Sequence, residues 1–360
     1  MIITGDIAVP AEEHVATLKT SLEKCSLNLD ENQHLLCNFE GLIYQTEKTF
    51  DEPVLYNHPN VIRSLFSSNS LIAALANNHI LDLPGEFDKT LKVFKENDVL
   101  YLGAGKTIQE ATEPIKVVEN GVEVFVLNAC WSFLLYNQKN PSKGVYVAEI
   151  QEKLLIHAVA CLKKENENAK IIVFLHWNFD LETLPFPMHR RFAKALIDAG
   201  ANVVAGAHSH CVQGGEKYND GYIVYGLGNF FIPNNIFAGG KIAYPEWTSP
   251  ELVLDWNPLT NEMKCHWFEY RKHNDKDQLE FIAADNFETS ERLQSFSPYQ
   301  NMDDNAYWEY FKQYRRKSFL IPVFKDYKEY RINKVKVMFL KYRAGFARLL
   351  AKKNVIKWQR

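Results

Sequence analysis

The sequence contains no C-x-x-C pair, although six cysteines are spread over its 360 residues. Without closely spaced cysteines we expect neither a zinc site built on thiolates nor a thioredoxin-like redox centre. The cysteines are interpreted as free thiols in a reducing compartment. They are Cys25, Cys37, Cys130, Cys161, Cys211 and Cys265.

Two kinds of membrane-related segment are also missing. No run approaches the roughly 18 uncharged apolar residues that identify a membrane-spanning helix. The first residues, Met1-Ile2-Ile3-Thr4, form an apolar run without the basic, apolar and small-residue regions of a secretory signal. We therefore expect a cytoplasmic protein that is soluble or peripheral on the inner face of the membrane.

An excess of positive charge is absent as well, since 41 Lys and Arg stand against 44 Asp and Glu, a net charge of −3. Phosphate backbones are bound by concentrated positive charge, so no nucleic-acid partner is expected. The charge is unevenly distributed, because residues 331–360 contain ten Lys and Arg and no acidic residue, which leaves −13 for the rest of the chain. A hydrophobic content of 46% predicts a large folded core and excludes a disordered chain.

Short apolar runs alternate with amphipathic helical patterns over the first 225 residues, which is typical of an α/β fold. Residues 84–97 and 188–200 each place large apolar side chains on one face of a helix. Alternating runs at 252–256 and 263–270 predict a β-hairpin, and the polar residues that follow, 273–305, predict a connection over the surface. The strands are expected at residues 1–4, 35–39, 71–75, 124–129, 171–175, 203–205 and 223–225.

Side chains able to bind metal ions directly follow five of these apolar runs. In open α/β sheets, ligands bind just beyond the carboxyl ends of the strands. One such residue alone is usually a helix cap, a turn residue or a hydrogen-bonded histidine, but five separate strand ends favour a shared site. Carboxylate oxygens together with imidazole nitrogens suit Zn, Mn, Fe or Ni and hydrolysis by metal-activated water. The residues are Asp6, Glu40, Asn78, His79, His176, His208 and His210.

The same residues stand in a succession of short motifs. The motifs are Gly5-Asp6, Asn38-x-Glu40-Gly41, Leu75-Ala76-Asn77-Asn78-His79-x-x-Asp82, Gly103-Ala104-Gly105, His176-Trp177, Gly206-x-His208-x-His210-x-x-Gln213 and Tyr225-Gly226-Leu227-Gly228-Asn229-Phe230. This order, which covers residues 1–235, resembles the CapA (PGA-cap) family of capsule-synthesis proteins. That family is similar to a branch of the calcineurin-like metallophosphoesterases.

The resemblance implies a four-layered α/β/β/α sandwich of two mixed sheets, to which the C-terminal helical pattern adds an extension. It also implies two divalent metal ions, Mn, Fe or Zn, at the carboxyl edge of the sheets. Asp6 and His210 would hold the first ion, Asn78, His176 and His208 the second, with Glu40 as the bridge and His79 as the catalytic acid. The chain would then divide into a catalytic domain over 1–272, a connecting segment over 273–302 and a basic helical extension over 303–360.

Two departures from the family pattern concern the site. The superfamily opening Asp-x-His is here Asp6-Ile7-Ala8, so the first metal site would be one ligand poorer. The family's His-Trp-Gly-x-Glu motif ends here in Asp180 at the position of the Glu. This shorter carboxylate either orients a ligand histidine or contacts the substrate. Asn77 and Asn229 are further candidates for substrate binding, and Asn229 could instead fix its own loop.

The resemblance also implies the function. We expect a metal-dependent hydrolase of the phosphoesterase type that acts in bacterial capsule or cell-surface polymer biosynthesis. The alternative is a non-catalytic or amide-processing assembly factor for a polymer like poly-γ-glutamate. The expected partners are a phosphorylated or anionic polymer precursor and capsule-assembly proteins.

The basic stretch 331–360 has the pattern of an amphipathic helix. Apolar residues recur in it every three or four positions. Such a helix could lie on an anionic membrane surface, or it could pack across an acidic face of its own domain, and the sequence leaves both open. The stripe consists of Val335, Phe339, Tyr342, Phe346, Leu349 and Leu350.

Overall fold

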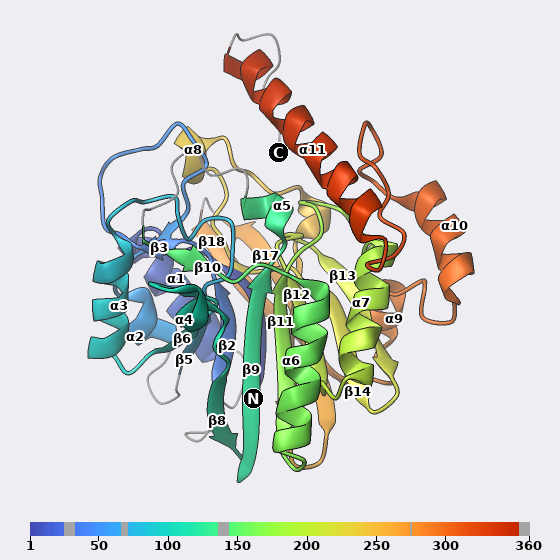
Figure 1. Ribbon diagram of the computed structural model, residues 1–360. Coiled ribbons are helices and arrows are strands. Elements are labelled where there is room, and N and C mark those ends of the chain that lie inside the picture. Colours follow the sequence, from blue (N-terminus) through green and yellow to red (C-terminus); the bar gives the residue numbers. More distant parts are fainter. Residues whose placement is uncertain (25–32, 66–70, 136–143, 274–275, 353–360) are drawn as a thin grey trace.

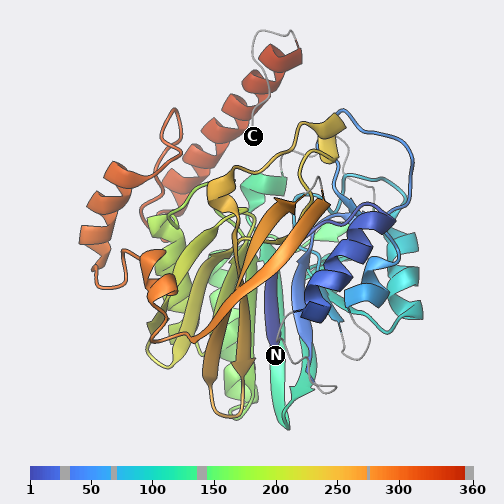
Figure 2. The same cartoon turned by 180° about the vertical axis from the view of Figure 1, so that it is seen from behind.

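Two β-sheets pack face to face in the computed structural model, which describes residues 1–24, 33–65, 71–135, 144–273 and 276–352. Helices cover the outer face of each sheet, so the molecule has four layers (Figure 1; Figure 2). The expected four-layered α/β sandwich of two mixed sheets, with a C-terminal helical extension, is confirmed.

The first sheet is parallel in its centre and antiparallel towards one edge. Its strands are β1 (Ile2–Ile7), β2 (Leu35–Phe39), β5 (Leu71–Ala74), β6 (Leu100–Leu102), β15 (Asn229–Phe231), β16 (Pro250–Asn257), β17 (Glu262–His273) and β18 (Lys276–Asn286). β1, β2, β5 and β6 pair in parallel in this order, and β15 pairs in parallel with β1. β16, β17 and β18 continue the sheet from β1 in antiparallel order.

The second sheet has a parallel centre flanked by an antiparallel strand on each side. Its strands are β8 (Ile115–Glu119), β9 (Val122–Cys130), β11 (Lys170–His176), β12 (Val203–Ala207), β13 (Val212–Tyr218) and β14 (Gly221–Leu227). They are ordered β13-β14-β12-β11-β9-β8. Two short ribbons pair β3 (Leu42–Ile43) with β4 (Tyr56–Asn57) and β7 (Ala104–Gly105) with β10 (Tyr146–Val147).

The helices lie on both outer faces and along the edges. They are α1 (Glu12–Lys24), α2 (Val61–Leu65), α3 (Phe87–Glu96), α4 (Ile108–Thr112), α5 (Ser132–Leu135), α6 (Glu152–Glu165), α7 (Pro187–Asp198), α8 (Phe237–Gly240), the 3-10 turn Glu246–Thr248, α9 (Glu291–Ser295), α10 (Asp304–Tyr314) and α11 (Tyr330–Lys352). Apolar side chains of α1, α2 and α3 pack on the first sheet. Those of α6 and α7 pack on the second.

Hydrophobic clusters fill the spaces between the layers, and successive residues of one strand face different clusters. In β11, Ile171 and Val173 pack against the outer helices, whereas Ile172 and Phe174 face the first sheet. Because both faces are covered, such strands read as continuous apolar runs, which is why the sequence predicts them. Burying each of these side chains contributes roughly 1.5–3 kcal/mol.

The seven strands expected from the sequence are all present, with bounds within a few residues. The helical patterns at 84–97 and 188–200 form α3 and α7, and the predicted hairpin forms β16 and β17. Five cysteines are free in the described part of the chain, whereas Cys25 lies outside it.

The prediction of a surface connection directly after the hairpin is wrong for residues 276–286. These residues form β18, which pairs with β17 along most of its length and forms an edge of the first sheet. The strand alternates, because Asp277 and Leu279 are buried while Glu280 is partly exposed and Ile282 is 38% exposed. A strand with one solvated face carries enough polar residues to resemble a loop in sequence.

The C-terminal extension packs on the outer face of the second sheet, beside α7. Tyr307, Phe311, Phe324 and Leu340 join the same hydrophobic cluster as α6 and α7. The predicted basic helix is confirmed as α11, while residues 353–360 lie outside the described part of the chain. None of the helices in the described ranges combines the length and the hydrophobicity that a bilayer span requires. The domain boundaries at 272 and 302 stay a prediction.

Candidate metal centre

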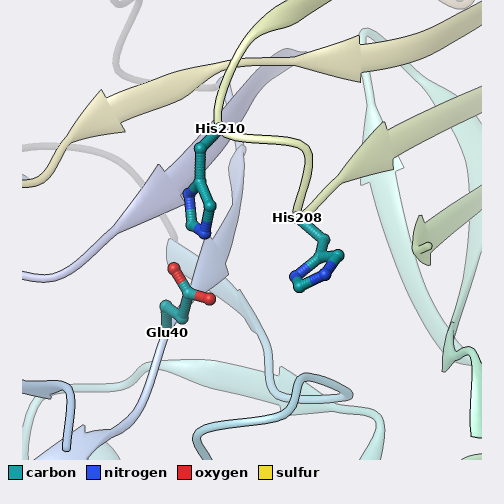
Figure 3. A group of neighbouring side chains, drawn as sticks. All are labelled: Glu40, His208 and His210. Atoms are coloured by element: carbon teal, nitrogen blue, oxygen red, sulfur yellow. The ribbon is translucent and has the colours of Figure 1, made fainter. Parts of the chain in front are cut away.

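Glu40, His208 and His210 converge at one edge of the two sheets (Figure 3). Glu40 follows β2, and the two histidines lie in the turn between β12 and β13. One ligand atom of each residue lies within 4.8 Å of the other two, and all three side chains are buried. Among the described residues, this is the group of His, Cys, Asp and Glu whose spacing suits a metal ion.

The topology brings these residues together, because the parallel strands of both sheets end at this edge. Asn128 of β9 links the two sheets here. Its amide oxygen accepts the backbone N–H of Ala76 at 2.7 Å, and its amide nitrogen donates to the carbonyl of Phe174 at 2.9 Å. Glu40 is fixed by its own N–H, which donates to the carbonyl of Ile7 at 2.9 Å.

Asp6 is fully buried near the end of β1 and contacts both histidines of the turn. Its Oδ2 lies 3.2 Å from His210 Nδ1 and accepts the backbone N–H of His208 at 3.1 Å. Asn38 Nδ2 donates to Asp6 Oδ1 at 2.7 Å, and Asn229 Oδ1 lies 2.7 Å from His210 Nδ1. This arrangement suits a carboxylate that orients a ligand histidine. The assignment of Asp6 as a metal ligand stays a prediction.

His208 and His176 lie side by side, with ring centroids 4.7 Å apart. Asp180 Oδ1 is 2.9 Å from His208 Nε2, and Asn78 Oδ1 is 2.6 Å from His176 Nε2. His176 Nε2 is also 4.0 Å from Glu40 Oε1. The position of Asp180 fits the role of orienting a ligand histidine, which was one of the two alternatives for it.

His79 approaches the same carboxylate oxygen as His176, with Nε2 3.9 Å from Glu40 Oε1. Its other ring nitrogen, Nδ1, is 2.5 Å from Asp82 Oδ2. The loop is held by Asn77, whose amide oxygen accepts the N–H of His79 at 3.1 Å and whose amide nitrogen donates to the carbonyl of Phe39 at 2.9 Å. Substrate binding by Asn77 and Asn229 stays a prediction, because both side chains have partners within the protein.

Each of these four histidines has a hydrogen-bonding neighbour at one ring nitrogen only. Buried polar atoms are normally satisfied in native proteins. Two of the exceptions belong to His208 and His210, which lie in one group with Glu40 and would suit a divalent transition metal, since such metals bind imidazole nitrogen. The buried nitrogens without a hydrogen-bond partner among the described residues are His79 Nε2, His176 Nδ1, His208 Nδ1 and His210 Nε2.

The electrostatics of the site also suit a cation. Burial lowers the pKa of His176 well below its usual range, and burial lowers the pKa of His208 against the opposing charge of Asp180. Burial alone would lower the pKa of His210 too, but the charges of Glu40 and Asp6 outweigh it and raise that pKa to about 9. Neutral imidazole is the form that binds metals. The negative charge that protonates His210 would equally attract a metal ion.

Sequence reasoning missed residues whose partners are distant in the chain. Asn128 lies inside an apolar strand, and Glu251 lies in β16 and is 2% exposed. Burial and the nearby charge of Asp6 raise the pKa of Glu251 well above its usual range. The Gly5-Asp6 motif gives no sign of why residue 5 is glycine, but in the structure a Cβ there would lie 2.0 Å from the carbonyl oxygen of Gly228. Its small size lets β1 approach that loop, and Asp6 N–H donates to the same carbonyl at 3.2 Å.

The family model and two curated relatives that match this chain are described in terms of capsule or PGA synthesis. The family model described as "Bacterial capsule synthesis protein PGA_cap" matches residues 2–234. The Bacillus anthracis "Capsule biosynthesis protein CapA" is 29% identical over 175 residues, 47% of this chain and 42% of its own length. The Bacillus subtilis "PGA biosynthesis protein CapA" is 30% identical over 199 residues, 54% of this chain and 51% of its own length. The aligned region thus spans about half the length of these curated relatives.

A solved structure of a Staphylococcus aureus protein described as a 5′-nucleotidase is similar in arrangement, with 11% sequence identity and a TM-score of 0.46. The similarity covers 82% of this chain and 57% of that one. These values are too low to carry an argument, so the fold rests on the strand pairing and the layers described above.

Proposed function

The chain belongs to the bacterial capsule synthesis protein family PGA_cap, and from this membership we propose that it is a metal-dependent hydrolase of the phosphoesterase type. Its proposed role is in the synthesis of a bacterial capsule or another cell-surface polymer. The observation that carries the hydrolase proposal is the gathering of three buried residues, Glu40, His208 and His210, with one ligand atom of each within 4.8 Å of the other two. A protein that only binds a polymer has no use for such a set.

We assign the metal ligands to the residues that surround this carboxylate. Glu40, His208 and His210 form the core of the site, and His176, Asn78 and Asp6 complete it. The proposal is two divalent ions, Mn, Fe or Zn, because nitrogen and oxygen donors suit these metals. Bound there, they would polarise a phosphoryl oxygen and activate water.

The protein's own groups would position the substrate's leaving atom and move protons. Asp82 accepts the Nδ1 proton of His79, so the proton that His79 can give away is on Nε2, which faces Glu40. From there it can protonate a leaving oxygen. Asp180 lies 2.9 Å from Nε2 of His208 and would hold the orientation of this ring.

The proposed substrate is a phosphorylated or anionic polymer precursor. Two observations support it: the relatives are described as capsule and PGA biosynthesis proteins, and the site suits metal-assisted hydrolysis. We propose a cytoplasmic location, where free thiols such as the five described cysteines persist.

The alternative is an assembly factor that is non-catalytic or processes amides. One observation favours it: a Mycobacterium tuberculosis relative, 26% identical over 244 residues, is described as a "Probable polyglutamine synthesis accessory protein". Accessory proteins need not hydrolyse anything. The two proposals differ in what the loaded protein cleaves.

The test is a hydrolysis screen of the full chain supplied with Mn, Fe and Zn. p-Nitrophenyl phosphate, bis(p-nitrophenyl) phosphate and γ-glutamyl-p-nitroanilide represent the three bond types. The proposal expects phosphate release that Glu40→Ala abolishes, because the proposed metal site then loses its central carboxylate, and that His157→Asn, a change of an exposed histidine on α6, leaves intact. Cleavage of the anilide alone supports the amide alternative, and no cleavage by a metal-loaded protein supports the non-catalytic one.

A further inference from the structure

Helix α11 has two apolar faces, and one of them packs on the body of the molecule. Leu340 is 1% exposed and Val337 packs against the cluster that also contains α7. The buried Asn333 donates from Nδ2 to the carbonyl of Asp326 at 2.7 Å, which fixes the start of the helix. This docked face does not include the apolar stripe that the sequence singled out.

The second face is exposed, and we call it the outer face of α11. Met338 and Tyr342 lie two positions on either side of Leu340 and therefore on the opposite side of the helix. The stripe residues Leu349 and Leu350 belong to the helix, but their side chains lie outside the described residues. The outer face consists of Val335, Met338, Phe339, Tyr342 and Phe346, which are 47% to 72% exposed.

Basic residues border the outer face on both sides. Lys334 and Lys341 are seven positions apart, two turns along one border, and Lys336 and Arg343 have the same spacing along the other. The helix contains no acidic residue between Tyr330 and Lys352. An apolar strip between two basic borders is the pattern of a helix that lies in a membrane interface.

A neighbouring loop extends the exposed apolar surface. Phe319 is 78% exposed and Leu320 is 56% exposed. The loop lies beside α11, because Arg343 Nη2 donates to the carbonyl of Phe319 at 3.4 Å. Two separate segments thus present large apolar side chains next to basic ones, and surfaces of this kind mark interaction sites.

We propose that the outer face of α11 docks on an anionic lipid surface. The apolar residues would enter the boundary between headgroups and acyl chains, while Lys334, Lys341 and Arg343 contact lipid phosphate. Lys336 lies 3.8 Å from Glu329 and stays with the body. Charge selects lipid over a second α11, since two such helices, neither of which contains an acidic residue, would bring like charges together. The body cannot cover this face, because α11 already packs on it through Leu340.

The docking would also place the candidate metal centre near the surface. α11 runs obliquely beyond the edge of the body on which α5 and α8 lie, as both views show (Figure 1; Figure 2). α5 directly follows β9, so this is the edge where the parallel strands end and the metal-binding side chains gather. Only this last step, the delivery of a surface-held substrate to the site, rests on the proposed function.

Co-sedimentation of the full chain with vesicles tests the proposal. One set of vesicles is phosphatidylcholine alone, and the other contains phosphatidylglycerol as well. We expect binding to the second set only, with a loss as salt is raised. Lys334→Gln with Lys341→Gln should lower the partition coefficient about tenfold or more. Tyr342→Ser with Phe346→Ser should lower it at least as far.

Matched control variants distinguish the outer face of α11 from the general effect of losing exposed lysines or exposed apolar side chains. Lys95→Gln with Lys264→Gln changes two exposed lysines elsewhere, and Leu154→Ser with Ile108→Ser changes two exposed apolar residues of other helices. Both controls should bind vesicles like the unaltered chain. All variants should keep the unaltered thermal unfolding midpoint and the same hydrolysis of a soluble phosphoester, so that failure here is distinct from failure of the proposed function.

Two results would overturn the proposal. Equal binding to neutral and anionic vesicles would remove the role of the basic borders. Absence of vesicle binding, together with a dimer in sedimentation velocity that Tyr342→Ser with Phe346→Ser dissociates, would show that the outer face joins two copies of the chain.

Discussion

The imidazole of His79 is held by the carboxylate of Asp82, with Nδ1 2.5 Å from Oδ2. The two residues are three positions apart in the loop after β5, so the pair forms locally. The free side of the ring faces Glu40, and Nε2 has no hydrogen-bond partner in the described part of the chain. His79 is therefore oriented towards the metal centre without belonging to its closest group of ligand atoms.

Replacing Asp82 by Asn should reduce activity while metal content stays the same. An amide cannot stabilise the protonated ring as a carboxylate does, and loss of such an orienting partner typically costs about 10–100-fold. The loss should grow as the leaving group becomes poorer, because proton donation then matters more. Rates for a series of substituted phenyl phosphates measure this dependence. A uniform loss across the series, or a parallel loss of metal, would contradict the role of Asp82 as a positioning residue.

Gly5→Ala should destabilise the fold and weaken metal binding together. The added Cβ would lie 2.0 Å from the carbonyl oxygen of Gly228, so β1 and its loop must separate. Crowding of this kind costs about 1–3 kcal/mol in the free energy of unfolding. It would also move Asp6 away from His210. Chemical denaturation and a metal titration measure the two effects.

Gly345→Ala is the matched control for that change. Gly345 lies in α11 with nothing near its Cβ position, so alanine should stabilise the helix by up to about 1 kcal/mol. Equal stability of Gly5→Ala and the unaltered chain would show that the close approach at Gly228 is not needed.

The buried His189 should make the free energy of unfolding depend on pH. Burial lowers its pKa from 6.5 to about 3, and the ring stacks on Trp177 with centroids 4.8 Å apart. Between these pH values the unfolded chain binds a proton that the folded chain does not. Stability therefore falls as the pH decreases from 6.5 towards 3, by about 1.4 kcal/mol per pH unit from this group.

Denaturation of His189→Gln across this pH range isolates the contribution. The variant should be less stable at pH 7, because the stacked ring is lost, but its stability should fall less steeply on acidification. His157→Gln, which changes an exposed histidine, should keep the steep dependence. Identical slopes for His189→Gln and the unaltered chain would mean that His189 can be protonated in the fold.

Much of the fold could be predicted from the sequence, because strands covered on both faces are continuous apolar runs. β2 and β11 are such strands. Glu40 directly follows β2, and His176 is the last residue of β11. Parallel strands share a carboxyl edge, so residues far apart in the sequence could be expected to meet there. The gathering of Glu40, His208 and His210 follows from this rule.

Other features depend on contacts that no local pattern reveals. Asn128 looks like a polar interruption in a strand, because the sequence does not show its two partners, Ala76 in the loop after β5 of the first sheet and Phe174 in β11 of the second. Residues 276–286 were missed as β18 because one face of the strand is polar. In α11, periodicity identified an apolar stripe but could not tell that Leu340 and Val337 form the docked face instead.

The number of metal ions bound per chain tests the central claim most directly. Elemental analysis of protein made with Mn, Fe and Zn supplied should find close to two ions, and Glu40→Ala should lose at least one, because under the proposal Glu40 would be a ligand shared by both ions. His79→Ala should keep the full number, because the proposal gives His79 the role of proton donor, with Nδ1 held by Asp82, and not that of a ligand. A chain that binds no metal under these conditions, or equal losses in His79→Ala and His208→Ala, would contradict the account.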